Sequence, residues 1–262
     1  MKLSVSNIAW TAWQDGSIYR EMKKYGYSGL EIAPTRWFPK APYDHVKQAQ
    51  EIYQQLKQEY ALHISSMQSI WYGRSENIWG TSEERKILEK YTEKAIDFAA
   101  SIECRNLVFG CPKNRNRVEK TDEAEIISWF RKLGHYADVH HVILAIEANP
   151  PIYCTNYINR TREAVNLIRR LECAGIGLNL DIGTMIENGE GLDDLEEAWS
   201  YICHVHISEP LLKPIERRSL HKELAAALRE HDYSGYVSIE MGKQDNLQVL
   251  EETMGYVAEE LG

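Results

Sequence analysis

The sequence predicts an α/β protein, a single (β/α)₈ barrel of the TIM type. Eight short runs of β-branched and apolar residues alternate along the chain with longer segments of helical periodicity. Strands that alternate with helices form a parallel sheet, and eight such units in 262 residues suit a closed barrel better than an open one. No Gly-x-Gly-x-x-Gly motif follows the first run, which disfavours a dinucleotide-binding fold. We expect one domain spanning residues 1–262.

Several of the expected strands contain consecutive apolar residues, which is typical of parallel strands covered on both faces. In chain order the expected strands are Leu3–Ala9, Gly29–Ala33, Leu62–Gln68, Asn106–Gly110, Val142–Ala148, Ile176–Asp181, Ile202–Ile207 and Gly235–Met241.

Helical periodicity fills the segments between these strands. Thr81 and Ser82 can cap the third of these helices, and acidic residues behind Thr121 indicate the start of the fourth. The other expected helices are Gly16–Tyr25, Tyr43–Tyr60, Thr161–Cys173, Asp193–Ser200, Ser219–His231 and Asp245–Leu261, and the third is Glu83–Ser101.

The composition excludes several classes of protein. The chain carries 30 Lys and Arg against 39 Asp and Glu, a net charge of −9, which disfavours a nucleic-acid partner. No apolar run is long enough to span a membrane, and Met1–Trp13 does not read as a signal peptide. The five cysteines are scattered without paired spacing, as expected for reduced thiols. We therefore expect a cytoplasmic protein.

Four residues with metal-binding side chains lie at the ends of the last four strands. They are Glu147 in AIEANPP, Asp181 in LNLDIG, His206 in HVHISEP and Glu240 in SIEMG. The carboxyl ends of barrel strands converge on one central point, where three carboxylates would repel one another unless a cation neutralised them. A lone Glu at a strand end is more often solvated or ion-paired, but four consecutive strand ends are a far less common coincidence. Oxygen ligands with one nitrogen suit Mn²⁺ or Mg²⁺, and also admit Co²⁺ or Zn²⁺.

Motifs along the whole chain resemble the xylose-isomerase-like TIM-barrel superfamily, in particular its sugar phosphate isomerase/epimerase branch. They are SNIAW, GYSGLEIAPTRWF, IEANPP, LNLDIGTM, VHISEP and YSGYVSIEM. The resemblance implies that Glu147, Asp181, His206 and Glu240 hold the metal, as the matching residues do in epimerases of the superfamily. Two features depart from the pattern: Thr184 stands where many members have His, and SEPLLKPIERR lacks an Arg at the usual spacing after the metal-binding His. These departures disfavour a standard ketose epimerisation.

By the same resemblance, Glu147 and Glu240 form the catalytic pair that removes and returns a proton through a metal-stabilised enediolate. Return to the opposite face gives epimerisation, return to the neighbouring carbon gives isomerisation, and loss of a β-hydroxyl gives dehydration, as with an inosose-like substrate. Spacing does not choose among them. Two further readings are a nuclease of the apurinic endonuclease type, disfavoured by the missing histidines, and a catalytically silent barrel. We expect a small carbohydrate as the partner, with a homodimer an open alternative.

Six further residues are candidates for binding the substrate, each weighed against a structural role: Asn149, Trp10, Glu31, Trp37, Gln68 and Glu209. Trp71 follows the third strand and, like the other two Trp residues, could stack on a sugar. His204 is expected to pack behind His206, and His221 to lie at the surface. The basic loop PKNRNR, with Lys113, Arg115 and Arg117, is either solvated or binds a phosphate or an acidic sugar.

Overall fold

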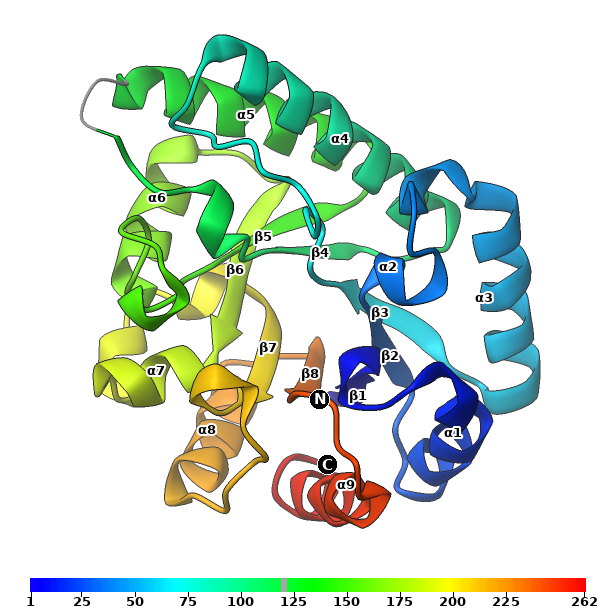
Figure 1. Cartoon of the computed structure of the whole chain (residues 1–262). Coiled ribbons are helices and arrows are strands. Elements are labelled where there is room, and N and C mark those ends of the chain that lie inside the picture. The colour runs from blue at the N-terminus through cyan, green and yellow to red at the C-terminus, as the bar shows by residue number, and fades with distance from the viewer. Residues whose placement is uncertain (119–121) are drawn as a thin grey trace.

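The computed structural model is a closed barrel of eight parallel strands surrounded by helices (Figure 1), which confirms the predicted fold class. It describes residues 1–118 and 122–262, so the expected helix start at Thr121 lies outside the described residues. Each strand pairs with the next, and β8 closes the barrel against β1. The strands are β1 Lys2–Ser6, β2 Gly29–Ile32, β3 His63–Met67, β4 Asn106–Phe109, β5 Ile143–Glu147, β6 Ile176–Asp181, β7 Ile202–Ser208 and β8 Tyr236–Glu240.

The α-helices form the outer layer and bury their apolar faces against the strands. Leu88, Ile96 and Phe98, for example, are buried on the inner face of α4. The α-helices of the described residues are α1 Asp15–Lys24, α2 Pro34–Trp37, α3 Val46–Tyr60, α4 Ser82–Ser101, α5 Glu123–Val139, α6 Thr161–Leu171, α7 Ile182–Asn188, α8 Ser219–Glu230 and α9 Leu247–Leu261.

Two helix starts are set by side chains that bind free backbone N–H groups. Thr81 caps α4 as predicted, through a capping box in which its side chain accepts from the Glu84 N–H. Asp181 caps α7, because its Oδ1 accepts from the Thr184 N–H at 2.6 Å. The chain therefore becomes helical directly after β6, and α7 ends at Gly189, which has φ +63°.

The helix expected over Asp193–Ser200 was wrong. That segment contains only two short 3₁₀ turns, Leu192–Leu195 and Trp199–Tyr201, and the α-helix of this unit is α7. Capping at Asp181 starts the helix of this unit directly after β6, earlier than the hydrophobic pattern suggested.

Small polar side chains fill part of the barrel interior. Ser4 Oγ on β1 lies 2.6 Å from Ser65 Oγ on β3, and Ser238 on β8 donates to Ser4. Side chains from distant parts of the sequence thus meet inside the barrel, below the level at which the strands end.

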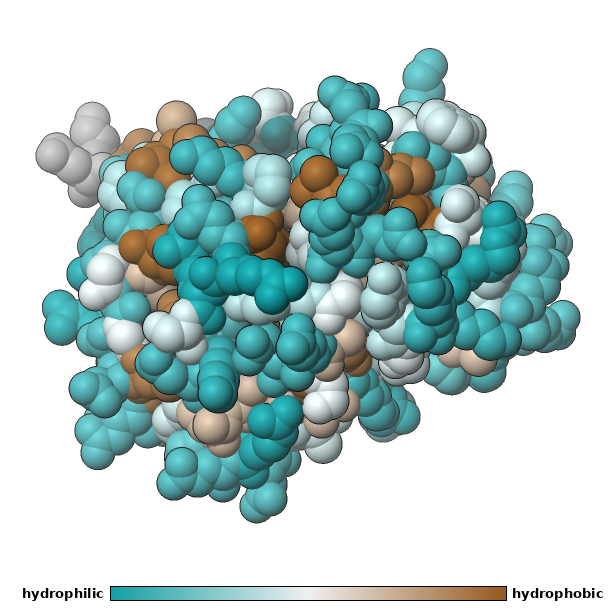
Figure 2. Space-filling model, turned by 90° about the horizontal axis from the view of Figure 1, so that it is seen from below, coloured by the Kyte–Doolittle hydropathy of each residue, from teal (hydrophilic) through white to brown (hydrophobic). Residues whose placement is uncertain are grey.

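The surface seen from the side of α8 and α9 is mostly hydrophilic, with small separate hydrophobic areas (Figure 2). Among the described residues no helix is both long and apolar enough to span a bilayer.

Candidate metal centre and cavity

The structure brings the four expected metal ligands together at the carboxyl end of the barrel. One ligand atom from each of Glu147, Asp181, His206 and Glu240 lies within 4.8 Å of the others. The imidazole is central: His206 Nδ1 lies 3.2 Å from Glu147 Oε1, 3.3 Å from Glu240 Oε2 and 3.8 Å from Asp181 Oδ2. The strand ends supply this convergence, since Asp181 and His206 are register partners on adjacent strands.

Glu31 orients the imidazole from the opposite side. Its Oε2 lies 2.8 Å from His206 Nε2 and 3.0 Å from His204 Nε2, and all three side chains are almost completely buried. A carboxylate at Nε2 holds the proton on that nitrogen and leaves the Nδ1 lone pair facing the cluster. Burial alone would raise the pKa of Glu31, but the positive charge of His206 and the hydrogen bonds from both histidines lower it.

The pKa values of the cluster reflect the cost of burying several carboxylates close together. Burial, with repulsion from Glu147 added, raises the pKa of Asp181 to about 6. Burial also raises the pKa of Glu240 to about 7, although His206 acts in the opposite direction. Burial would lower the pKa of His206, but Glu31 and Glu240 raise it well above 6.5.

These residues fit a divalent cation. Three carboxylates and one imidazole nitrogen form a set of hard ligands typical of Mn²⁺ or Mg²⁺. Burial, with repulsion from neighbouring carboxylates added, raises the pKa values of Asp181 and Glu240, and a bound cation would favour their charged forms. Hydrogen bonds already fix the carboxylates: Ser208 Oγ donates to Asp181 Oδ2 at 2.5 Å, and Asn179 Nδ2 donates to Glu147 Oε1 at 2.6 Å.

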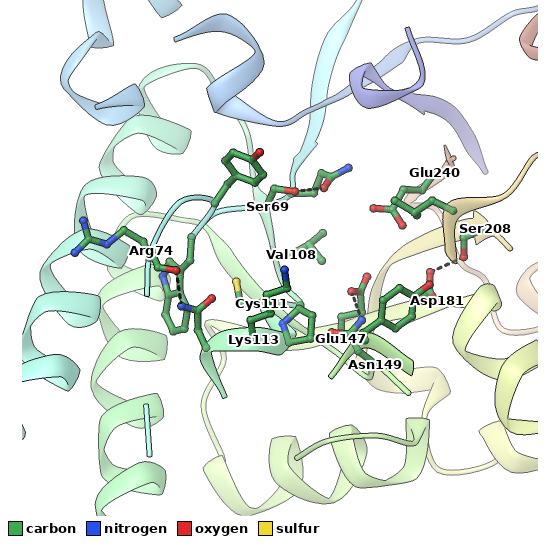
Figure 3. A pocket seen from close by; sticks show the side chains of 18 of the residues that line it. Ser69, Arg74, Val108, Cys111, Lys113, Glu147, Asn149, Asp181, Ser208 and Glu240 are labelled. Atoms are coloured by element: carbon green, nitrogen blue, oxygen red, sulfur yellow. Dashed lines mark hydrogen bonds between the residues drawn. The ribbon is translucent and has the colours of Figure 1, made fainter. Parts of the chain in front are cut away.

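A cavity of about 510 Å³ extends from the ligand cluster toward the loops that follow β3 and β4. Glu147, Asp181 and Glu240 lie at one end of it and Arg74 at the other (Figure 3). Its remaining lining mixes polar and aromatic groups, among them Trp71, Tyr72 and Tyr153.

Three of the six expected substrate-binding residues line the cavity, namely Asn149, Gln68 and Glu209. Asn149 donates from Nδ2 to Glu147 Oε2 at 2.8 Å. Gln68 donates to Ser6 Oγ at 2.9 Å.

Trp10, Glu31 and Trp37 are not among the residues that line the cavity. Trp10 is 2% exposed and donates its indole N–H to Asp15. Trp37 is half-buried against Phe38. Glu31 lies beneath the ligand cluster, where it binds the two histidines instead of facing the cavity. The Trp that lines the cavity is Trp71, whose indole N–H is bound by Thr92 Oγ1.

The departures noted in the sequence have structural counterparts. Thr184 donates its hydroxyl to the Ala148 carbonyl at 2.8 Å, so it ties α7 to the end of β5. Arg218 forms two hydrogen bonds with the Glu209 carboxylate, at 2.7 and 2.6 Å. Arg218, which follows the expected metal ligand His206 in the sequence, therefore neutralises a buried carboxylate at the cavity wall.

Two expectations about charged side chains were wrong. His221 was expected at the surface, but it is fully buried beside Tyr256 Oη, and burial lowers its pKa to about 4. The basic loop was expected either to be solvated or to bind a phosphate or an acidic sugar, and solvation is wrong for Arg115, which is buried. Lys113 lines the cavity and Arg117 packs over the Trp79 ring.

Several residues that support the ligands were not predicted from the sequence. Ser208 and Asn179 share a strand face with His206 and Asp181 by the period-two rule, so this signal could have identified them. Gly110 leaves room for the Glu147 carboxylate, because a Cβ there would lie 2.6 Å from Oε2. Nothing in a basic loop signals that Arg115 turns inward.

Comparison with known proteins identifies the family. Residues 19–260 match the model of the xylose isomerase-like TIM barrel family. The chain belongs to this family. This match confirms the resemblance to the superfamily that the sequence motifs indicate. No curated protein matches the chain.

Solved structures with this fold include several sugar epimerases. D-psicose 3-epimerase from Clostridium cellulolyticum H10 is 16% identical, with a TM-score of 0.79 over 99% of this chain and 97% of its own. The 3-keto-D-glucoside 4-epimerase from E. coli is 19% identical, with a TM-score of 0.78 over 99% of both chains. An AP endonuclease of family 2 from Brucella melitensis is 20% identical, with a TM-score of 0.74 over 99% of both chains. At these identities the likeness shows the fold.

Proposed function

We propose that this protein is a divalent-metal-dependent isomerase or epimerase of a sugar or sugar derivative. The observation that carries the proposal is the meeting of Glu147, Asp181, His206 and Glu240 at one end of a cavity with a mixed polar and aromatic lining. Family membership and the sugar epimerases among the structural neighbours support it.

In this proposal Glu147, Asp181, His206 and Glu240 hold the cation, and Glu147 and Glu240 also transfer the proton. A bound cation would stabilise the negative charge that develops on the substrate oxygen as the proton leaves the neighbouring carbon. Glu147 and Glu240 end β5 and β8, so they flank the cluster from different strands. Two carboxylates that approach a carbon from different sides can remove a proton from one face and return it to the other.

The neighbouring residues keep the two carboxylates in place. Asn149 and Asn179 each donate to one oxygen of Glu147, which fixes the plane of its carboxylate. His206 Nδ1 lies 3.3 Å from Glu240 Oε2. Such fixed orientation reduces the reorganisation needed during proton transfer.

The rest of the cavity suits a polyhydroxylated ligand. Gln68, Asn149 and Glu209 present amide and carboxylate groups that can bind hydroxyls, and Trp71 and Tyr153 present aromatic surface. We propose that these residues recognise the sugar.

Solvent-deuterium exchange tests the proposal. Purified protein loaded with Mn²⁺ is incubated in D₂O with D-fructose, D-tagatose and a 3-keto-glucoside, and the products are followed by NMR. We expect deuterium at a carbon next to the carbonyl of at least one substrate. Glu147→Gln and Glu240→Gln should each abolish this exchange, because each removes one of the two proton-transfer groups.

Glu190→Gln is the matched control, since Glu190 is a buried glutamate whose side chain is 5% exposed and which pairs with Arg160 outside the cavity. This variant should exchange at the wild-type rate. Turnover without deuterium incorporation would refute proton transfer, and net loss of water from the product would assign the site to dehydration.

A further inference from the structure

Arg115 is a buried cation next to the proposed metal centre. The side chain lies in the loop after β4 and is fully buried. Nη1 donates to the main-chain carbonyl of Glu147 at 2.8 Å, and Nη2 donates to Asn149 Oδ1 at 2.8 Å and to the Ile158 carbonyl at 3.3 Å. All three acceptors are uncharged.

Burial of this guanidinium costs free energy, because the charge loses its hydration. Among the described residues Arg115 makes no ion pair with a carboxylate, and its Nε has no hydrogen-bond partner. Burial lowers the pKa of Arg115 to about 10, and Glu147 acts against that shift. The group is still charged at neutral pH, and burying a charge without an ionic partner costs free energy.

The contacts of Arg115 converge on Glu147. One hydrogen bond fixes the carbonyl of Glu147 itself, where β5 ends. The other fixes the amide of Asn149: because Oδ1 accepts from the guanidinium, Nδ2 must face the Glu147 carboxylate, to which it donates at 2.8 Å. The carboxylate is confined on a further side by Gly110, where a Cβ would lie 2.6 Å from Oε2.

We propose that Arg115 is a positioning residue that sets the orientation of the Glu147 carboxylate through Asn149. The guanidinium fixes both the main chain and the amide that hold this carboxylate, and it does so from outside the cavity. The inference rests on the proposed function, which makes Glu147 a metal ligand and a proton-transfer group. The contacts of Arg115 do not depend on which reaction the protein catalyses.

Metal binding to purified metal-free protein tests the proposal without a substrate. Mn²⁺ affinity is measured by calorimetry and ligand geometry by the visible absorption of bound Co²⁺, for wild type and for Arg115→Met, Arg115→Lys and Asn149→Ala. We expect Arg115→Met to weaken Mn²⁺ binding about tenfold and to change the Co²⁺ spectrum, as outer residues of metal sites do. Arg115→Lys should have a Mn²⁺ affinity between those of wild type and Arg115→Met, since it keeps the charge and loses the bidentate geometry.

The double variant shows whether the effect passes through Asn149. Arg115→Met combined with Asn149→Ala should bind Mn²⁺ no more weakly than the weaker single variant, because both remove one connected path. Arg117→Met is the matched control, since Arg117 lies in the same loop but packs over Trp79. It should retain wild-type affinity and spectrum.

Wild-type affinity and an unchanged Co²⁺ spectrum in Arg115→Met would overturn the proposal. Should the Arg115 variants fail to fold, Asn149→Ala decides, because it leaves the guanidinium in place: unchanged affinity there overturns the proposal as well. Should wild type itself bind neither metal, the proposed function fails separately. The position of Glu147 in crystals of metal-free Arg115→Met then decides, with a displaced carboxylate supporting the inference and an unmoved one overturning it.

Discussion

Glu240 provides a direct test of the charge balance in the ligand cluster, because its carboxylate is crowded by others. Replacing it with Gln keeps the shape and removes the charge. In the metal-free protein we expect Glu240→Gln to be more stable than wild type at pH 8. At pH 4.5, where Glu240 is protonated in the folded state and half-protonated in the unfolded state, the difference from this group should shrink to about 0.4 kcal/mol.

The magnitude follows from the pKa of this group. Its pKa is about 7 in the folded protein, against 4.5 as the ordinary value. As pH rises from 4.5 to 7, the unfolded chain loses the Glu240 proton while the folded protein keeps it, so the free energy of unfolding falls. Each pKa unit corresponds to about 1.4 kcal/mol, so the loss levels off at roughly 3 kcal/mol above pH 7. Glu240→Gln should not suffer this loss.

Urea unfolding of metal-free wild type and Glu240→Gln, at pH values between 4.5 and 8, measures the difference. Adding Mn²⁺ at about 100 times the wild-type Kd should then stabilise wild type by roughly 2.7 kcal/mol and close most of the gap, because Glu240→Gln lacks a ligand. Glu190→Gln serves as the control, since it removes a buried carboxylate that is paired with Arg160. A stability difference for Glu240→Gln that does not change with pH would refute the reasoning.

Three further predictions concern the same centre. Gly110→Ala should reduce solvent-deuterium exchange at least tenfold, because the new Cβ would lie 2.6 Å from Glu147 Oε2, whereas Gly191→Ala, with no neighbour near its Cβ, should leave exchange unchanged. Glu31→Gln should weaken Mn²⁺ binding about 10- to 100-fold in calorimetry, because it removes the charge that fixes the proton on His206 Nε2; wild-type affinity would contradict this. Mn²⁺ should bind more tightly as pH rises from about 5 to 8, with release of protons detected in buffers of different ionisation enthalpy, because the raised pKa of His206 makes protons compete with the cation. A Kd independent of pH would contradict this last prediction.

The fold could be predicted because strands and helices alternate in a simple order and several strands contain consecutive apolar residues. The expected helix over Asp193–Ser200 was wrong for a local reason. Its apolar residues are spaced as in a helix, but Asp181 accepts the Thr184 N–H and starts α7 much earlier. A cap formed by an expected metal ligand could not be inferred from hydrophobic periodicity.

In the candidate site, the sequence identified residues by where strands end, and this rule does not give their depth in the barrel. Glu31 was expected at a strand end like Glu147, but β2 continues to Ile32 and Glu31 lies below the cavity. The register between β2 and β3 shifts at Leu30 and Glu31, a feature that the spacing of residues does not reveal. Glu31 then meets His206, 175 positions away, across the barrel. Arg115 was missed for a related reason, since its role comes from acceptors on a different unit.

The two nitrogens of His206 distinguish a metal centre from a catalytically silent barrel. Nε2 faces Glu31, and Nδ1 faces the three carboxylates of the cluster. Without a cation, a doubly protonated His206 imidazole partly neutralises these carboxylates. A cation must displace the Nδ1 proton, while the proton on Nε2 stays bound to Glu31. A silent barrel would keep both protons at neutral pH in the presence of Mn²⁺, whereas a metal centre gives up one. The contact with Glu31 is the same in both cases. Only the loss or retention of the Nδ1 proton distinguishes a metal centre from a silent barrel.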